Sequence, residues 1–75
     1  MTEISIHDEY ITLGQLLKKA DVLSTGGQVK WFLQEYRILV NNEEEARRGR
    51  KLYPGDIVSI ENIGDFKITL GRKSE

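Results

Sequence analysis

Residues 24–60 read STGGQVKWFLQEYRILVNNEEEARRGRKLYPGDIVSI, and this stretch carries most of the local signals that decide the fold. A glycine pair precedes an amphipathic segment, and a short β-rich run then leads into two asparagines. A dense group of cations follows, and a Pro-Gly-Asp turn leads into a second β-rich run. A helix start beside a cationic loop and a short sheet would suit a small nucleic-acid-binding module.

Two segments repeat apolar residues at the spacing of one helical face. The members are Leu13, Leu16, Leu17 and Ala20 in the first segment, and Val29, Phe32, Leu33 and Tyr36 in the second. Thr12 is the predicted N-cap of the first helix, and Ser24 or Thr25 is that of the second. We expect two helices of about ten residues each, closely joined through residues 21–23 into a helical pair.

The other patterned segments predict strands. They are residues 3–10 as an edge strand, residues 38–40, a brief return strand within the polar loop 43–51, residues 57–60, and the alternating Phe66, Ile68 and Leu70. Asn41-Asn42 predicts a hairpin turn, because asparagine tolerates positive φ. Tyr53-Pro54-Gly55-Asp56 predicts a β-turn with proline second and glycine third. The tail, residues 71–75, is expected to fray.

This order of elements predicts a single α+β domain over residues 1–75. The helix pair would pack on a short, mostly antiparallel sheet, and residues 11–61 would form the central motif. We expect the apolar faces of both helices to meet Val40, Val58 and Ile60 in one core. A chain this short buries a small core and is only marginally stable.

The overall charge argues against binding nucleic acid by bulk attraction. The 75 residues include 11 basic and 12 acidic side chains, for a net charge of −1. Proteins that coat nucleic acid are usually strongly basic. Residues 26–53, however, carry a local excess of two positive charges, whereas both flanking segments are net negative. Any attraction for phosphate must therefore be local.

No pattern indicates catalysis, a metal site or a cofactor. His7 is the only histidine, and its acidic neighbours form no recognisable catalytic constellation. The chain has no cysteine, which excludes a disulfide framework and fits a reducing cytoplasm. No apolar run approaches the roughly 18 residues of a membrane span, and the N-terminus lacks the pattern of a signal peptide. We expect a monomeric, cytoplasmic binding module that is not an enzyme.

The segment Arg47-Arg48-Gly49-Arg50-Lys51 is the sharpest chemical signal, with four cations in five residues. Arginine can hold a phosphate with two parallel hydrogen bonds. Two interpretations remain open for the preceding acids, residues 43–45. They either neutralise a solvated loop or face away across the hairpin and leave the cations free.

The start of the second helix is another candidate contact. Gly26 and Gly27 would let a phosphate approach the first helical amides, although the same glycines also suit a tight interhelical turn. Lys30 lies one turn further, on the polar side of the helix. Trp31 lies off the apolar stripe, so it either stacks on a base or packs elsewhere on the domain, and packing is the expected outcome.

Ser24 through Ile60 resembles the S-four-type (αL) RNA-binding domain, named after a ribosomal protein of the small subunit. Members carry a helix pair, a V-N-G hairpin and a K-x-x-P-G-D-x-V strand entry. Residues 38–42 and 51–58 match the last two motifs. Over about residues 4–61, the chain is more narrowly similar to the stand-alone YaaA-like subgroup. That similarity rests on residues 11–15, the Thr-Gly-Gly start, Lys30 and the segment 47–51.

The resemblance implies binding to structured RNA, often ribosomal RNA or ribosomal particles, through phosphate and shape contacts. The implied contacts are Thr25, Gly26, Gly27, Gln28, Lys30, Arg47, Arg48, Arg50 and Lys51, with Lys18, Lys19 and Trp31 as additional candidates. Thr25-Gly26 stands where the broad family often has Ser-Arg, which removes one arginine that could contact RNA. Tyr36 at the helix exit and Asn42 in the hairpin replace glycines, and both affect turn geometry.

Two other functions compete with RNA binding. A protein-interaction module without direct RNA contact would suit the net negative charge, an exposed Trp31 and the glutamate run. A ubiquitin-like sulfur carrier can also enter a strand through a Gly-Asp turn. Such carriers need a C-terminal Gly-Gly, whereas this chain ends Gly71-Arg72-Lys73-Ser74-Glu75.

Overall fold

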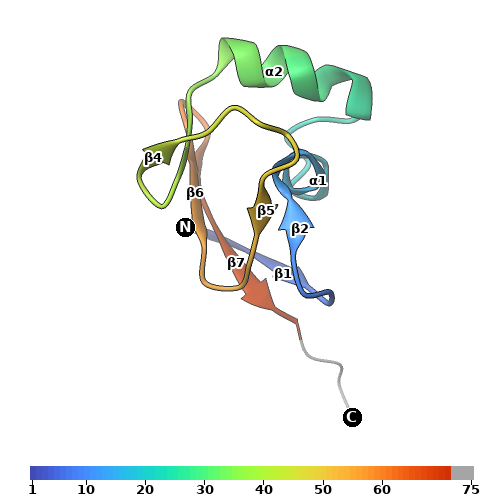
Figure 1. The fold of residues 1–75 in the computed structure, drawn as a ribbon, viewed down its shortest axis with the longest axis vertical. Helices are drawn as coiled ribbons and strands as arrows, with labels where there is room; N and C mark the ends of the chain where they lie inside the picture. The colour runs from blue at the N-terminus through green and yellow to red at the C-terminus, as the bar shows by residue number, and fades with distance from the viewer. Residues whose placement is uncertain (72–75) are drawn as a thin grey trace.

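The computed structural model describes residues 1–71, which form an α+β domain (Figure 1). The strands are β1 (Thr2–Ile6), β2 (Ile11–Thr12), β3 (Ile38–Val40), β4 (Glu43–Glu44), β5 (Lys51–Leu52), β6 (Ile57–Ile60) and β7 (Gly64–Leu70). The helices are α1 (Leu13–Lys19), the short 3-10 helix η1 (Gly26–Gln28) and α2 (Val29–Glu35). The predicted α+β class is confirmed.

Five strands form the main sheet in the order β1-β7-β6-β3-β4. All neighbours are antiparallel except β1 and β7, which run parallel with Ile4 opposite Ile68. The predicted edge strand is confirmed as β1, at one end of the sheet, but it ends at Ile6 rather than at Tyr10. A separate two-stranded sheet pairs β2 with β5, with Ile11 opposite Leu52. The sequence patterns did not predict this pair, because each strand is only two residues long.

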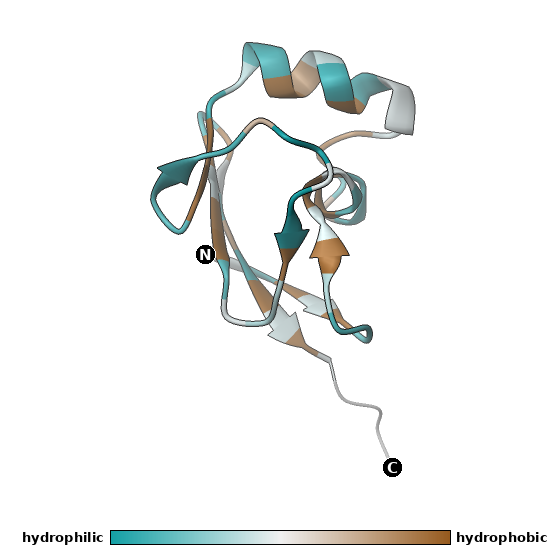
Figure 2. Cartoon of the chain, viewed as in Figure 1, coloured by the Kyte–Doolittle hydropathy of each residue, from teal (hydrophilic) through white to brown (hydrophobic). Residues whose placement is uncertain are grey.

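The core lies between the helices and one face of the main sheet. Its buried residues are Ile4, Ile6, Ile11, Leu13, Leu16, Leu17, Leu23, Val29, Phe32, Leu33, Ile38, Val40, Leu52, Val58, Ile60, Phe66 and Ile68. Strand side chains alternate between faces, so the apolar members point inward and their neighbours point to solvent. Figure 2 shows the apolar stripe of α2 on the side that faces the rest of the molecule. The predicted core is confirmed.

Local sequence signals explain the turns and the first helix. The Thr12 hydroxyl accepts a hydrogen bond from the Gln15 amide, and the Gln15 side chain accepts one from the Thr12 amide, which caps α1. Asn41 and Asn42 have φ of 52° and 71° in the β3–β4 turn. Gly55 has φ of 101°, as a type II turn requires at that position. These predictions are confirmed.

Several expectations about the fold need correction. Each α-helix has seven residues, fewer than expected, although η1 extends α2 at its start. Leu70 continues the alternation of β7 but is 58% exposed, because it lies at the strand end. Within residues 1–71, no helix has the length and apolar character needed to cross a membrane. The expected fraying of residues 71–75 falls outside the described residues except for Gly71, whose amide donates to the Ile6 carbonyl.

Candidate nucleic-acid interface

The basic loop, residues 45–50, is held against the start of α1 by two backbone hydrogen bonds. The Gly14 amide donates to the Arg48 carbonyl, and the Leu13 amide donates to the Arg50 carbonyl, both at 2.9 Å. A helix leaves its first amides without internal partners, so the loop satisfies two of them. A Cβ built on buried Gly14 would lie 3.5 Å from both the Cβ and the carbonyl of Arg48. An alanine at this position would therefore just touch the loop, whereas a larger side chain would press against it.

A depression of about 290 Å³ opens where the loop meets the two helices. Its lining includes Lys18 from α1, Gly26 from η1 and Arg48 from the loop. The Lys18 Nζ would lie only 3.8 Å from a Cβ built on Gly26. This places the ammonium of Lys18 beside the start of the second helix, where the sequence predicted a phosphate contact.

A second depression, of about 490 Å³, lies on the other side of Arg48, between α2 and the loop. Lys30 and Gln34 line it from successive turns of α2, and Leu33 and Ala46 supply apolar surface. Arg48 lines both depressions. We call Lys18, Lys30 and Arg48 the open cations. They line these two depressions, and no ion pair within residues 1–71 involves any of them.

The other two arginines of the loop are held by Glu45. The Arg47 Nε lies 2.9 Å from one Glu45 carboxylate oxygen, and the Arg50 Nη1 lies 2.7 Å from the other. The Arg47 backbone amide also donates to this carboxylate. The Glu45 side chain is only 7% exposed. The Arg47 guanidinium, helped by Arg50, lowers the pKa of Glu45 from 4.5 to about 2, although burial opposes this shift.

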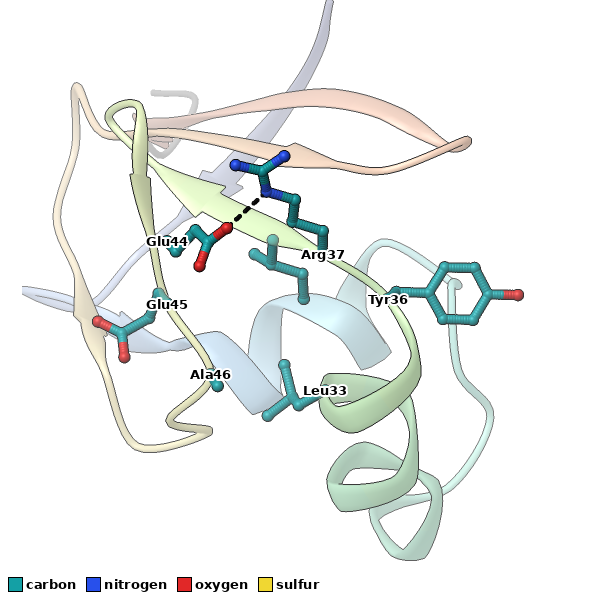
Figure 3. Close-up of a pocket in the computed structure, with 7 residues that line it drawn as sticks. Leu33, Tyr36, Arg37, Glu44, Glu45 and Ala46 are labelled. Carbon is teal, nitrogen blue, oxygen red and sulfur yellow. Dashed lines mark ion pairs between the residues drawn. The ribbon is translucent and has the colours of Figure 1, made fainter.

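Glu44 and Glu45 therefore behave differently. Figure 3 shows the carboxylates of Glu44 and Glu45 directed away from each other, with Glu44 reaching Arg37 at 2.7 Å. The interpretation that the acids all face away from the basic cluster is wrong for Glu45, because the loop folds back over that residue. It holds for Glu44. We call Arg47 and Arg50 the paired arginines.

The start of the second helix is held by a side-chain cap. The Gln28 Oε1 accepts hydrogen bonds from the backbone amides of Ser24 and Thr25, at 3.1 and 3.3 Å. Gln28, predicted as an RNA contact, is thus engaged within the chain. Thr25, Gly26 and Gly27 are all exposed. Their contact with RNA remains a prediction.

The remaining candidates lie on different parts of the surface. Trp31 is 55% exposed and touches Tyr36 edge-on at 6.4 Å, so the expectation that it packs against the domain is wrong. On the helix surface, Trp31 is flanked by Lys30 and Gln34 on one side and by Glu35 on the other, and all of these residues are exposed. Lys19 is exposed at the end of α1. Lys51 leaves the loop on β5, and its Nζ lies 5.0 Å from the centre of the Tyr10 ring.

Sequence reasoning missed three residues that shape this surface. Thr12, Gly14 and Gln15 line the depression beside Lys18. The sequence had marked Thr12 as a helix cap and all three as part of a family motif, but none as a contact residue. A glycine in the first turn of a helix, next to a capping box, is the signal that could have indicated close approach by another segment. Within the described part of the chain, no group of three His, Cys, Asp or Glu side chains is placed to hold a metal ion.

Comparison with known proteins agrees with this geometry. Residues 4–69 match the model of the S4 domain family. The chain is 60% identical over 65 residues to "Probable ribosome maturation protein RlbA" from Bacillus subtilis (strain 168). That alignment covers 87% of this chain and 92% of the relative. The helix pair, the asparagine hairpin and the Pro-Gly-Asp strand entry all lie inside the matched region, and the chain belongs to the S4 domain family.

Proposed function

We propose that this protein is a non-catalytic factor that binds structured ribosomal RNA, within ribosomal particles that are being matured. Its family and the printed name of its relative support a ribosome-related role. RNA recognition would rest on phosphate and shape contacts rather than base reading. The proposal places the protein in the cytoplasm, with ribosomal particles, and as a monomer when free.

One observation carries this proposal. Arg48 lies between two depressions, with Lys18 on one side and Lys30 on the other. Each of these cations is exposed, and no described acidic side chain forms an ion pair with them. Cations held around a concave surface without an internal counter-ion attract phosphates, and a bent RNA backbone presents several phosphates at once.

The other predicted site residues would contribute to RNA binding to different extents. Thr25, Gly26 and Gly27 border the open cations and would permit close approach of the RNA backbone. Lys51 and Lys19 would extend the charged surface along β5 and α1. The paired arginines would contribute less, because a phosphate would have to compete with Glu45 for each guanidinium.

A salt titration tests the proposal. The protein would be titrated with ribosomal particles and with deproteinised ribosomal RNA at several salt concentrations. If about four phosphates are neutralised, log K should fall against log salt with a slope of about −3. Binding to both samples that does not change between low and physiological salt would contradict the proposed contacts.

Trp31 supports a second candidate function, a protein-interaction module. A tryptophan that is 55% exposed on a helix is a frequent anchor in protein interfaces. In that case, the protein would bind ribosomal particles but not deproteinised RNA, and Trp31→Ala would abolish the binding. In the favoured function, Trp31→Ala leaves binding to deproteinised RNA within about threefold of the parent, because phosphate contacts dominate affinity.

A further inference from the structure

Two tyrosines and a lysine form a partly exposed group at the two-stranded sheet. The rings of Tyr10 and Tyr53 lie 5.7 Å apart at an angle of 49°. The Lys51 Nζ lies 5.0 Å from the centre of the Tyr10 ring, within the range of a cation–π contact. We call these three residues the tyrosine platform.

The platform faces the same side as the open cations. Tyr10 and Thr12 flank buried Ile11, and side chains of a strand alternate between faces. On the partner strand, Lys51 and Tyr53 flank buried Leu52 in the same way, and Thr12 is opposite Lys51. All four outward side chains therefore share one face. Thr12 also lines the depression that holds Lys18 and Arg48, so the platform continues that surface.

Tyr53 is the open ring of the platform. It is 44% exposed, whereas Tyr10 is half-buried and carries the Lys51 ammonium over its ring. The backbone of Tyr53 is fixed, because its amide donates to the Asp56 carboxylate at 2.8 Å and its carbonyl accepts from the Asp56 amide at 2.9 Å. This fixed backbone and the contact with the Tyr10 ring limit the conformational entropy that Tyr53 loses when a flat partner stacks on it.

We infer that the tyrosine platform is a binding site for one unpaired nucleotide of the RNA. The base stacks on Tyr53, and the Lys51 ammonium contacts the adjoining phosphate. Aromatic rings accept any base, because every base has a π face. Asp8 and Glu9 are exposed next to Tyr10 and would repel further phosphates, so the site holds a single nucleotide rather than an extended strand. The inference rests on the proposed RNA binding and adds a nucleotide class to it.

The test uses two RNA hairpins with the same stem at low salt, where backbone contacts alone give measurable binding. One hairpin is fully paired up to its loop, and the other has one unpaired fluorescent adenine analogue beside the stem. The parent protein should prefer the second hairpin about tenfold, and the analogue's fluorescence should fall on binding. Tyr53→Leu should lose both the preference and the fluorescence change, whereas Tyr53→Phe should keep both.

Ultraviolet crosslinking of the parent protein gives a second readout that does not depend on a variant's folding. A nucleotide adduct on Tyr53, found by mass spectrometry, supports the site, with half-buried Tyr36 at the C-terminal end of α2 as the internal control. Equal binding of both hairpins with unchanged fluorescence and no adduct on Tyr53 would overturn the inference while leaving the proposed function intact. Failure of the parent to bind either hairpin at low salt would overturn both.

Discussion

The open cations and the paired arginines lie within one small region, yet their electrostatic surroundings differ. Arg47, Arg48 and Arg50 are almost adjacent in sequence, and by composition they would count as one basic cluster. Glu45 forms hydrogen bonds with the first and last of them. Arg48, between them, lines two depressions with Lys18 and Lys30 instead. The comparison shows that local folding decides which charges in a basic run remain available to a ligand.

Glu45 is the reason that Arg47 and Arg50 differ from Arg48. Its side chain is 7% exposed, and its carboxylate accepts a bidentate contact from Arg47. Charge-assisted contacts of this geometry are among the stronger hydrogen bonds in proteins. A phosphate that approaches Arg47 or Arg50 must replace such a contact, whereas one that approaches Arg48 replaces only water.

Removing a core side chain of α2 should destabilise the whole domain, and with it both the open cations and the paired arginines. Phe32 is 3% exposed and stacks on Tyr36 at 4.3 Å. Phe32→Ala should lower the free energy of unfolding by about 3–5 kcal/mol, a large share of a small domain's stability. Thermal and urea denaturation would measure this, with Gln34→Ala on the exposed face as the matched control. An unchanged melting temperature would remove Phe32 from the core.

Enlarging Gly14 should move the loop without removing a charge. Gly14→Ala should be tolerated, because the added Cβ lies at an ordinary contact distance of 3.5 Å from Arg48 and Val29. The two γ carbons of valine in Gly14→Val would extend past the Cβ toward these neighbours, and the crowding should cost about 1–3 kcal/mol of stability. It should also weaken RNA binding, because Arg48 loses its position. Valine and alanine variants with equal melting temperatures and equal RNA affinity would show that the close approach does not matter.

Single arginine substitutions should separate the two groups. Arg48→Gln should weaken RNA binding about tenfold and make the salt slope less negative by about 0.7–0.9. Arg47→Gln, which removes the same charge from a neighbouring residue, should change affinity by about twofold or less. Fluorescence titration at two salt concentrations would measure both variants. Equal losses would indicate that Glu45 does not restrain Arg47 during binding.

Replacing Glu45 should have the smallest effect on stability and a particular pH dependence. The pKa of Glu45 is depressed from 4.5 to about 2, so its contribution is present above pH 4.5 and is lost as pH falls toward 2. Glu45→Gln should therefore reduce stability at neutral pH, by about 1 kcal/mol after allowance for solvent screening at exposed Arg47. The difference from the parent should shrink as pH falls through 2 and vanish below that value. A difference that persists there would have another cause.

The same variant should bind RNA slightly more tightly at neutral pH, because it frees two guanidinium groups. Glu44→Gln is the matched control, since it removes the same charge from an acid that pairs only with Arg37 within the described residues. If both variants gain affinity equally, the effect comes from net charge rather than from release of the paired arginines.

Much of the fold could be predicted, because its signals are local. The spacing of Leu13, Leu16 and Leu17 predicted a buried face, and Asn41-Asn42 and Gly55 predicted the turns that the φ angles confirm. The parallel pairing of β1 with β7 could not be predicted from these signals, because it joins residues more than sixty positions apart. The exposure of Trp31 was also missed, since no periodic pattern says whether another element covers a helix flank.

The candidate site was predictable as a set of residues but not as an arrangement. Charge density marked the segment from Arg47 to Lys51. Which arginines of that segment are paired and which is open depends on two contacts. Glu45 lies under the loop and binds Arg50, and the Gly14 amide donates to the Arg48 carbonyl. Both contacts are set by the docking of the loop on α1. Sequence spacing alone left both the neutralised and the open interpretation possible.

The most direct test of this account compares two double variants that remove the same charge. One carries Lys30→Gln with Arg48→Gln, and the other carries Arg47→Gln with Arg50→Gln. Affinity for deproteinised ribosomal RNA would be measured across a series of salt concentrations, after circular dichroism shows that both variants are folded. We expect the salt slope of the first variant to become less negative by about 1.5, while the slope of the second stays close to that of the parent. Equal slopes for the two variants would contradict this expectation.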